Sequence, residues 1–465
     1  MASQRVGSCG DDCQPVVNVG HLLPGDVTLA AESAKESAKE SAKRKTRSDA
    51  QREAKKSNNG DNGEEEAIRH MEGASPEAMH GCYFSSAWRP PLLVRECSEK
   101  ARAKAERSML AHEYLDDVET LRGKVAVLVE LIKSSKNCVI YSGAGISTSA
   151  GINDYASVAH DSEALKAPRV KNAFTAQPTL SHHILTALVR AGYIKEWIQQ
   201  NHDGLPQKAG CPQHVVNELH GAWFDPSNPV ISMSGNLRGD LSRRFDVWAK
   251  KADLVLALGT SLAATAADEI VEMVSSRVHP HGQRGGAVII TLQQTFYDNR
   301  SALRIFSKID DVFRMVAESM GLLATLPPLD THYQPDIPAV AIIPSSPTES
   351  PKDVFLIPYN KAGKRAPAGA ALMRWDLSVG ARVRIVYGPA KDFAGKILGK
   401  SGDGDYHVQF PRIVADGDQW LYARDERRGR TDARGPRTYI MGRWWVESAA
   451  KGLCDRIPFV NNGDT

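Results

Sequence analysis

The sequence lacks the long apolar run of a membrane-spanning helix and the paired cysteines of a disulfide-stabilised protein. The uncharged stretch between Asp253 and Asp268 is too short and too rich in Ala and Thr to cross a bilayer. The seven cysteines are scattered and odd in number, which argues against a disulfide framework and indicates a reducing compartment. The start of the sequence lacks the charged-then-apolar pattern of a signal peptide. We therefore expect a soluble intracellular protein that needs no membrane.

A strong charge imbalance is also missing. The formal net charge is +3, which is too close to neutral to predict a nucleic-acid partner from bulk charge alone. With 42% apolar and 24% charged residues, the 465-residue chain has ordinary globular composition and room for two or three domains.

Residues 1–107 are predicted to be a disordered tail. They contain a triple ESAK repeat and then a basic stretch from Lys43 to Lys56, followed by the polar run SNNGDNGEEE. No packed core could use this composition. The basic stretch is equally compatible with nuclear import or nucleic-acid binding and with a solvated tail that has no partner.

The pattern between residues 108 and 323 predicts a doubly wound α/β domain with a Rossmann-like, mainly parallel sheet. Apolar residues at helical spacing alternate there with short β-branched runs. Helices are expected at 118–133, 181–190 and before 321, and strands at 138–141, 194–199, 253–258 and 287–292.

The central stretch of this domain is NCVIYSGAGISTSAGINDY, residues 137–155. A buried strand runs directly into Gly143-Ala144-Gly145, and the hydroxyl residues from Ser147 onward are suited to the first turn of a helix. Such a glycine turn at a helix N-terminus lets backbone amides approach a phosphate closely. Thr148 stands where a full G-x-G-x-x-G motif has its third glycine, so a plain tight turn is an equal alternative at this point.

Polar clusters follow the predicted strands at Tyr141, Ile198 and Leu258, where ligands bind in open α/β sheets. Gln200, Asn201 and Asp203 follow the second of these strands, and Thr260-Ser261 follows the third after Gly259. His220 stands elsewhere, before a glycine. Taken singly, a histidine at such a position is more often a surface or capping residue than a catalytic one.

The C-terminal third of the chain changes character. Residues 324–372 are rich in Pro, Ala and Ser and are predicted to be a linker. Alternating apolar residues over 373–450 predict a small SH3-like β-barrel, with a tail at 451–465. Tryptophans and arginines are interleaved there, up to Arg443, which is compatible with nucleic-acid or protein binding. Core packing of the tryptophans is the plainer alternative.

Taken together, these motifs resemble the sirtuin family of NAD-dependent protein deacylases, over residues 108–322 approximately. GAGISTSAGINDY is similar to the family's GAGIS-x-x-x-GIPDFR, and QQNHDGLPQKAG is similar to its TQN-x-DGLH-x-x-AG. NELHG, LALGTSL, ITLQQT and LRIFSKIDDV follow in the family's order. The wording around ELHG and GNLR resembles the nuclear, chromatin-associated branch most, which implies a nuclear location.

The resemblance implies a reaction in which an acyl group passes from lysine to the ADP-ribose part of NAD and nicotinamide is released. It implies that His220 is the general base on a ribose hydroxyl, and that Asn201 and Asp203 frame the nicotinamide pocket. The implied NAD-binding residues are Gly143, Ala144, Gly145, Ser147, Asp154, Tyr155, Gln200, Asn201, Asp203, Gly259, Thr260, Ser261 and Ile309. An acylated-lysine protein is the implied substrate.

Two departures from the family pattern stand out. The family has an arginine where this chain has Ala156, which bears on the rate or on cofactor geometry. The family also has two Cys-x-x-Cys pairs after its HG motif, which hold a structural zinc in a small lobe. No cysteine lies between Gly221 and Arg238 here, so we predict a reduced small lobe without zinc and no other metal site.

Three functions remain open on the sequence alone. The leading one is a zinc-less NAD-dependent protein deacylase. The second is NAD hydrolysis or ADP-ribosyl transfer, which is favoured if the substrate groove cannot hold a peptide. The third is a weakly active NAD-binding scaffold protein in which the C-terminal domain does the binding.

Overall fold

The structure is a computed structural model, and the chain divides into two compact units, 1–67 and 68–465. All described residues belong to the second unit. They are residues 71, 73–102, 105, 107–153, 169–170, 172–231, 235–263, 266–278, 285–329, 331–342, 353–411, 414–415, 419–420 and 437–462. The predicted ESAK repeat and basic stretch lie outside them, as do Asp154, Tyr155 and Ala156.

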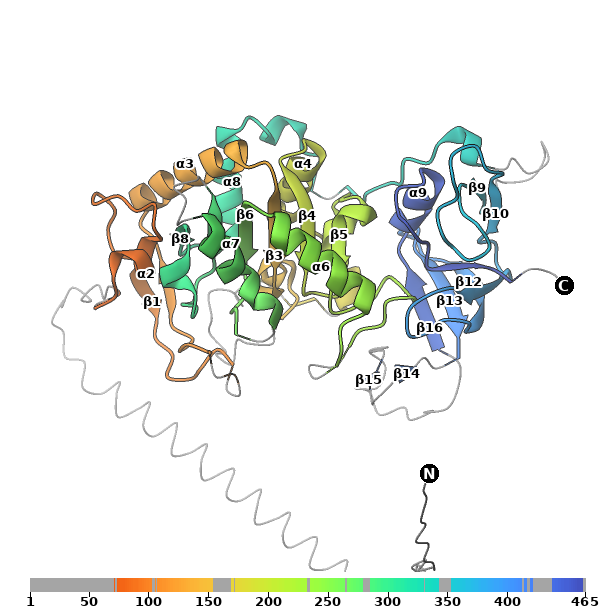
Figure 1. The fold of residues 1–465 in the computed structure, drawn as a ribbon, viewed down its shortest axis with the longest axis horizontal. Helices are drawn as coiled ribbons and strands as arrows, with labels where there is room; N and C mark the ends of the chain where they lie inside the picture. Colours follow the sequence, from red (N-terminus) through yellow and green to blue (C-terminus); the bar gives the residue numbers. More distant parts are fainter. Residues whose placement is uncertain are drawn as a thin grey trace, which may run out of the picture. The chain divides into compact units, whose positions relative to one another are not determined.

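A six-stranded parallel sheet forms the centre of the larger domain (Figure 1). Its order is β5-β4-β3-β6-β7-β8, and every neighbouring pair is parallel. The strands are β3 (Cys138–Ser142), β4 (Ile194–Gln199), β5 (Val216–Glu218), β6 (Leu254–Leu258), β7 (Gly286–Ile290) and β8 (Leu303–Ile305). Counted from β3, this is the strand order of Rossmann dinucleotide-binding folds, which confirms the predicted fold class for this domain.

Helices cover both faces of this sheet, so its central strands are buried throughout. The first face packs on α3 (Val118–Ser134), α4 (Leu180–Arg190) and α8 (Ile309–Ser319). The second packs on α6 (Gly239–Lys251) and α7 (Ile270–Val278). None of the described helices is long and apolar enough to cross a membrane.

The predicted N-terminal boundary at residue 107 is wrong, because the described part of 71–107 is folded against the larger domain. It contains α2 (Pro76–His80) and β1 (Leu92–Arg95), which pairs antiparallel with β2 (Glu113–Leu115). Tyr83 N–H also donates to the carbonyl of Ala302, 2.9 Å away, just before β8. These pairings join residues that are far apart in the sequence, so the local sequence pattern does not predict them.

The chain after β3 forms two short 3-10 turns, Ala144–Ile146 and Thr148–Ala150, instead of the expected helix N-terminus. The Ser147 N–H donates to the Ala144 carbonyl, and the Thr148 hydroxyl donates to the Gly145 carbonyl at 3.0 Å. The hydroxyl residues that we expected to start a helix thus close local turns.

The C-terminal module, which we define as residues 353–462, is built from antiparallel strands. Its main sheet has the order β16-β13-β12-β11-β17, and a hairpin of β9 and β10 accompanies it. The elements are β9 (Val354–Ile357), β10 (Met373–Asp376), β11 (Arg382–Ile385), β12 (Ala394–Lys400), β13 (Tyr406–Phe410), β14 (Val414–Ala415), β15 (Gln419–Trp420), β16 (Arg437–Met441), α9 (Trp444–Ala450) and β17 (Phe459–Asn461).

The predicted linker and tail boundaries need correction. Strand β9 lies inside the predicted 324–372 linker, and Phe355 and Ile357 are buried in the core of the C-terminal module. Strand β17 lies inside the predicted 451–465 tail, with Phe459 fully buried. Trp375 and Trp444 are buried in the core of the C-terminal module, in agreement with the interpretation that tryptophans of this region pack in its core.

Phe355→Ala should lower the free energy of unfolding by about 3–4 kcal/mol, because it empties a buried aromatic site. Chemical denaturation of the full chain measures this. Val340→Ala is the matched control, since Val340 lies in the same predicted linker but is 82% exposed, and it should leave stability unchanged. Equal stability of the two variants would restore the linker interpretation of β9.

Candidate active site

The candidate site lies at the carboxyl ends of β3, β4 and β6. Strand β3 has β4 on one side and β6 on the other, so the sheet is extended in opposite directions from this strand. In open α/β sheets the crevice at such a switch point is where ligands bind.

The turns after β3 and β6 approach each other so closely that no side chain fits between them. A Cβ on Gly145 would lie 2.7 Å from the Cα of Gly259, and one on Gly143 would lie 2.8 Å from the Gly259 oxygen. The Gly145 N–H donates to the Gly259 carbonyl at 2.8 Å. Gly259 also has a φ of 58°, in the left-handed region. The glycines are therefore required by the contact between the two turns, a reason that the sequence pattern did not reveal.

A buried carboxylate joins the turn after β3 to the segment after β4. The Ser147 hydroxyl donates to Asp203 Oδ2 at 2.7 Å, and Asn201 Nδ2 donates to the Ser147 hydroxyl at 3.1 Å and to the Gly143 carbonyl at 3.0 Å. The other oxygen of Asp203 accepts from the Leu205 N–H at 3.0 Å. Asp203 is only 2% exposed, so this network holds its carboxylate and the Asn201 amide in fixed positions.

A second network joins β4 to β6 and includes a residue that sequence reasoning missed. Gln200 Nε2 donates to the Thr260 hydroxyl at 3.1 Å and lies 3.5 Å from Asp268 Oδ1. Asp268 is buried and also accepts from the hydroxyl of Tyr141, at 2.8 Å. The available signal was Tyr141 itself, because a tyrosine inside a fully buried strand needs an acceptor for its hydroxyl.

His220 follows β5 and is held against the segment after β4. Its ring makes a hydrogen bond with the main chain of Gln200, and its carbonyl accepts from the Ile231 N–H at 3.1 Å. Burial, followed by the electrostatic effect of the neighbouring His202, lowers the pKa of His220 to about 4. The imidazole is therefore uncharged at neutral pH and can accept a proton.

The structure brings together most of the predicted site residues but not all of them. Connected by the two networks and the turn contact are Gly143, Gly145, Ser147, Gln200, Asn201, Asp203, Gly259 and Thr260, with His220 joined through Gln200. Ala144 and Ser261 are their half-buried neighbours in the chain. Ile309 packs into the main core, while the next residue, Asp310, accepts from the Ser149 hydroxyl at 2.8 Å.

The segment that follows His220 would contain the zinc-binding lobe in the sirtuin pattern, but its described part, residues 222–230, is a short loop in this chain. Phe224, in this loop, is 2% exposed and lies 5.3 Å from Trp444 of the C-terminal module, measured between ring centroids. Within the described part of the chain, no group of three or more His, Cys, Asp or Glu residues is placed to hold a metal ion. The absence of zinc stays a prediction from the sequence.

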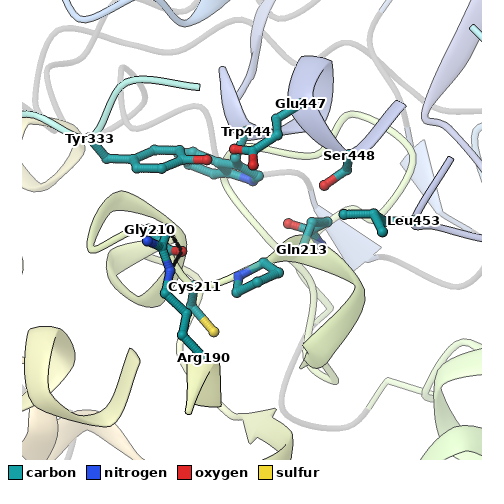
Figure 2. A pocket seen from close by; sticks show the side chains of 10 residues that line it. Arg190, Gly210, Cys211, Gln213, Tyr333, Trp444, Glu447, Ser448 and Leu453 are labelled. Carbon is teal, nitrogen blue, oxygen red and sulfur yellow. Dashed lines mark hydrogen bonds between the residues drawn. The ribbon is translucent and has the colours of Figure 1, made fainter. Parts of the chain in front are cut away.

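A separate small pocket lies where the larger domain meets α9, and it contains none of the predicted site residues (Figure 2). Arg190 lines it and donates to the Gly210 carbonyl at 2.8 Å. The full lining is Arg190, Gly210, Cys211, Pro212, Gln213, Tyr333, Trp444, Glu447, Ser448 and Leu453. This pocket belongs to the junction between the two parts of the unit rather than to the polar networks.

We predict that the His220 imidazole titrates at a pKa of about 4, because its burial disfavours the charged ring. In the unfolded chain the same ring has the ordinary histidine pKa of about 6.5. The unfolded state therefore binds a proton more readily, and His220 lowers the stability of the fold as the pH falls from about 6.5 to about 4. NMR titration of the histidine ring protons measures the pKa, with His220→Ala to assign the signal. Titration at the ordinary value would contradict the buried placement.

Comparison with known proteins places these motifs in one family. The chain is 41% identical over 259 residues to the NAD-dependent protein deacetylase Sirt6 of Drosophila melanogaster, covering 46% of this chain and 80% of that protein. It is 28% identical over 276 residues to the NAD-dependent protein deacetylase sirtuin-7 of Homo sapiens, covering 50% of this chain and 68% of that one. With NAD-dependent protein deacetylase SRT1 of Arabidopsis thaliana the identity is 32%, over 45% of this chain and 52% of the relative.

Among solved structures, a Sir2–p53 peptide–NAD+ complex matches 42% of this chain and 98% of its own, at 23% identity and a TM-score of 0.35. No family model matches the sequence. The identity to Drosophila Sirt6 over four fifths of that protein, together with the ordered series of motifs, decides the assignment. The chain belongs to the sirtuin family of NAD-dependent protein deacetylases.

Proposed function

We propose that the protein is an NAD-dependent protein-lysine deacylase that transfers the acyl group of an acyl-lysine to ADP-ribose and releases nicotinamide. The observation that carries this proposal is the convergence of Asn201, Asp203 and His220 at the carboxyl ends of adjacent strands in a sirtuin-family chain. Each of the three has the chemistry that this reaction needs.

NAD fits the residues present at the switch point. The main chain of the Gly143–Ser147 turn and the Thr260 and Ser261 hydroxyls would face the pyrophosphate and ribose oxygens, which accept hydrogen bonds. Thr260 is already held by Gln200, so its hydroxyl is oriented before any ligand arrives. When bound, NAD supplies an electrophilic ribose carbon whose bond to nicotinamide breaks.

Asn201 and Asp203 are proposed to frame the nicotinamide amide. The network of Ser147, Asn201 and Asp203 is buried and fixes the carboxylate and amide in place, so they need not be ordered on binding. Asp154 and Tyr155, proposed as further cofactor-binding residues, lie outside the described residues. Ile309 is proposed to lie near the adenine.

His220 is proposed to remove the proton from a ribose hydroxyl. A general base must be unprotonated at working pH, and the lowered pKa of His220 keeps the ring neutral there, while it also makes the ring a weaker base than an ordinary imidazole. Its hydrogen bond with the Gln200 main chain orients the ring toward the same strand ends that hold Asn201. The acyl-lysine carbonyl oxygen attacks the ribose carbon as nicotinamide leaves.

NAD hydrolysis or ADP-ribosyl transfer is the second candidate. The observation that favours it is the reduced lobe that follows His220, because that lobe helps to form the peptide groove in the family. A weakly active scaffold protein is the third candidate. Ala156 favours it, because the family has an arginine near the cofactor at this position, whereas the retained Asn201, Asp203 and His220 argue against it.

For the C-terminal module we propose an SH3-like barrel in which the β9–β10 hairpin closes the five-stranded sheet. Its proposed partners are nucleic acid or protein, bound with help from the arginine-rich segment 421–436, which lies outside the described residues. The proposed domains are thus a sirtuin catalytic domain ending near residue 323 and this module.

The basic N-terminal stretch and the motif resemblance support a nuclear location.

His220→Ala should reduce deacylation of an acetyl-lysine peptide by roughly 100-fold or more, because the variant has no base for the ribose hydroxyl. Incubation with NAD and peptide, with both nicotinamide and deacetylated peptide measured, tests this. Nicotinamide release without peptide would instead favour the hydrolase. No release from the wild-type protein would rule out both enzymes.

His332→Ala is the matched control, because His332 is an exposed histidine far along the chain and its variant should keep full activity. Full activity in His220→Ala would overturn the assignment of the base. The same rate loss in both histidine variants would show that the assay reports protein quality rather than chemistry.

A further inference from the structure

The connection from His220 to α6 begins with residues 222–230, which we call the 222–230 loop. It contains no helix or strand, yet all its residues except Trp223 are buried. Buried irregular backbone must find partners for its polar groups. Its sequence has no cysteine or histidine that could hold a structural zinc, so we ask which other groups hold this loop in place.

Part of the support comes from the larger domain itself. The Trp223 N–H donates to the His202 carbonyl at 2.9 Å, and Asn228 Nδ2 donates to the Glu218 carbonyl at 2.9 Å. Asp225 Oδ1 accepts from both the N–H and the hydroxyl of Ser227, at 2.8 and 2.6 Å. These bonds shape the loop and attach its two ends beside β5, but they leave its middle to be covered from outside.

The C-terminal module covers that middle. Phe224 is counted within the module's hydrophobic core rather than in the core of its own domain, and its ring lies against Trp444. The Gly442 N–H donates to the Phe224 carbonyl at 3.0 Å. Lys208, from α5 (Leu205–Lys208), places its ammonium 4.8 Å from the centroid of the same ring. Phe224 is therefore held by both parts of the unit.

A second contact lies three residues further on. Gly388 of the module approaches Ser227 so closely that a Cβ would lie 2.2 Å from the Ser227 oxygen. That oxygen accepts from Arg238 Nη1 at 3.0 Å, and the Arg238 guanidinium lies 4.9 Å from the centre of the Tyr387 ring. The loop is thus held at two separate points, by the segment that follows β11 and by the segment that joins β16 to α9.

We propose that the C-terminal module holds the 222–230 loop in place, as a structural zinc holds the corresponding lobe in the family pattern. Phe224 is then a positioning residue for the active site. This inference rests on the proposed function, because His220 is the residue positioned. The 222–230 loop starts two residues after His220 and returns to it, since the Ile231 N–H donates to the His220 carbonyl. Displacing the loop therefore moves His220 relative to the Asn201 network.

Loss of the Phe224 ring should change kcat without changing NAD affinity, whereas a general loss of stability would change both. Phe224 is not part of the turns after β3 and β6, so its loss should leave NAD affinity unchanged. It should lower kcat for deacylation, because a small displacement of a base reduces the rate steeply. It should also speed hydrogen exchange of the 222–230 amides, which lose their cover.

The experiment compares Phe224→Leu with Phe410→Leu in the full-length protein. Phe410 is also fully buried in the module core, but it packs against Tyr439 and Phe459 instead of the loop. The measurements are kcat with an acetyl-lysine peptide, NAD affinity by calorimetry, and hydrogen exchange of peptides covering 222–231. We expect Phe224→Leu to lose roughly tenfold in kcat and to exchange faster, at unchanged NAD affinity, with Phe410→Leu close to wild type.

Equal kcat and equal exchange in the two variants would overturn the proposal, as would a loss of NAD affinity that parallels the loss of kcat. If the wild-type protein shows no deacylation, the proposed function fails. Hydrogen exchange then still decides whether the C-terminal module holds the loop, so the two failures can be told apart.

Discussion

The site depends on one steric constraint, the contact between the turn after β3 and the turn after β6. Gly145 and Gly259 leave no space for a Cβ on either side, and the hydrogen bond between them ties the two turns together. This contact sets the position of Ser147 and Thr260, from which the two polar networks start. A parallel sheet supplies it because adjacent parallel strands end at the same edge.

The second constraint is the burial of a loop that has no regular structure. The middle of the 222–230 loop is covered by Trp444 and Gly442 of the C-terminal module, which lie more than two hundred residues further along the sequence. Such a solution links catalytic geometry to the integrity of the C-terminal module. Trp444 thus belongs to the core of the module and also contacts Phe224 of the larger domain, while the Gly442 N–H donates to the Phe224 carbonyl.

Four strands of the parallel sheet, β3, β4, β6 and β7, could be predicted from sequence, and the clearest is the fully buried apolar run Leu254–Leu258. The edge-side strands β5 and β8 were missed, because each has only three residues and therefore too short a pattern. The β1–β2 pair and strands β9 and β17 could not, because their partners are remote or their runs resemble linker. The family motifs led to Asn201, Asp203 and His220, while Asp268 was missed because only its buried partners define its role. The contacts that hold Phe224 against the C-terminal module could not be predicted either, since a contact between two domains leaves no pattern in the local sequence.

A sirtuin-type site is expected to work in this chain without a lobe held by a metal ion. The rate of NAD-dependent deacylation, measured after exhaustive treatment of the full-length protein with a zinc chelator, tests this, with nicotinamide and deacetylated peptide both counted. The rate should be unchanged, and one nicotinamide should be released for each lysine freed. A rate that is lost on chelation and restored by added zinc would contradict a metal-free lobe.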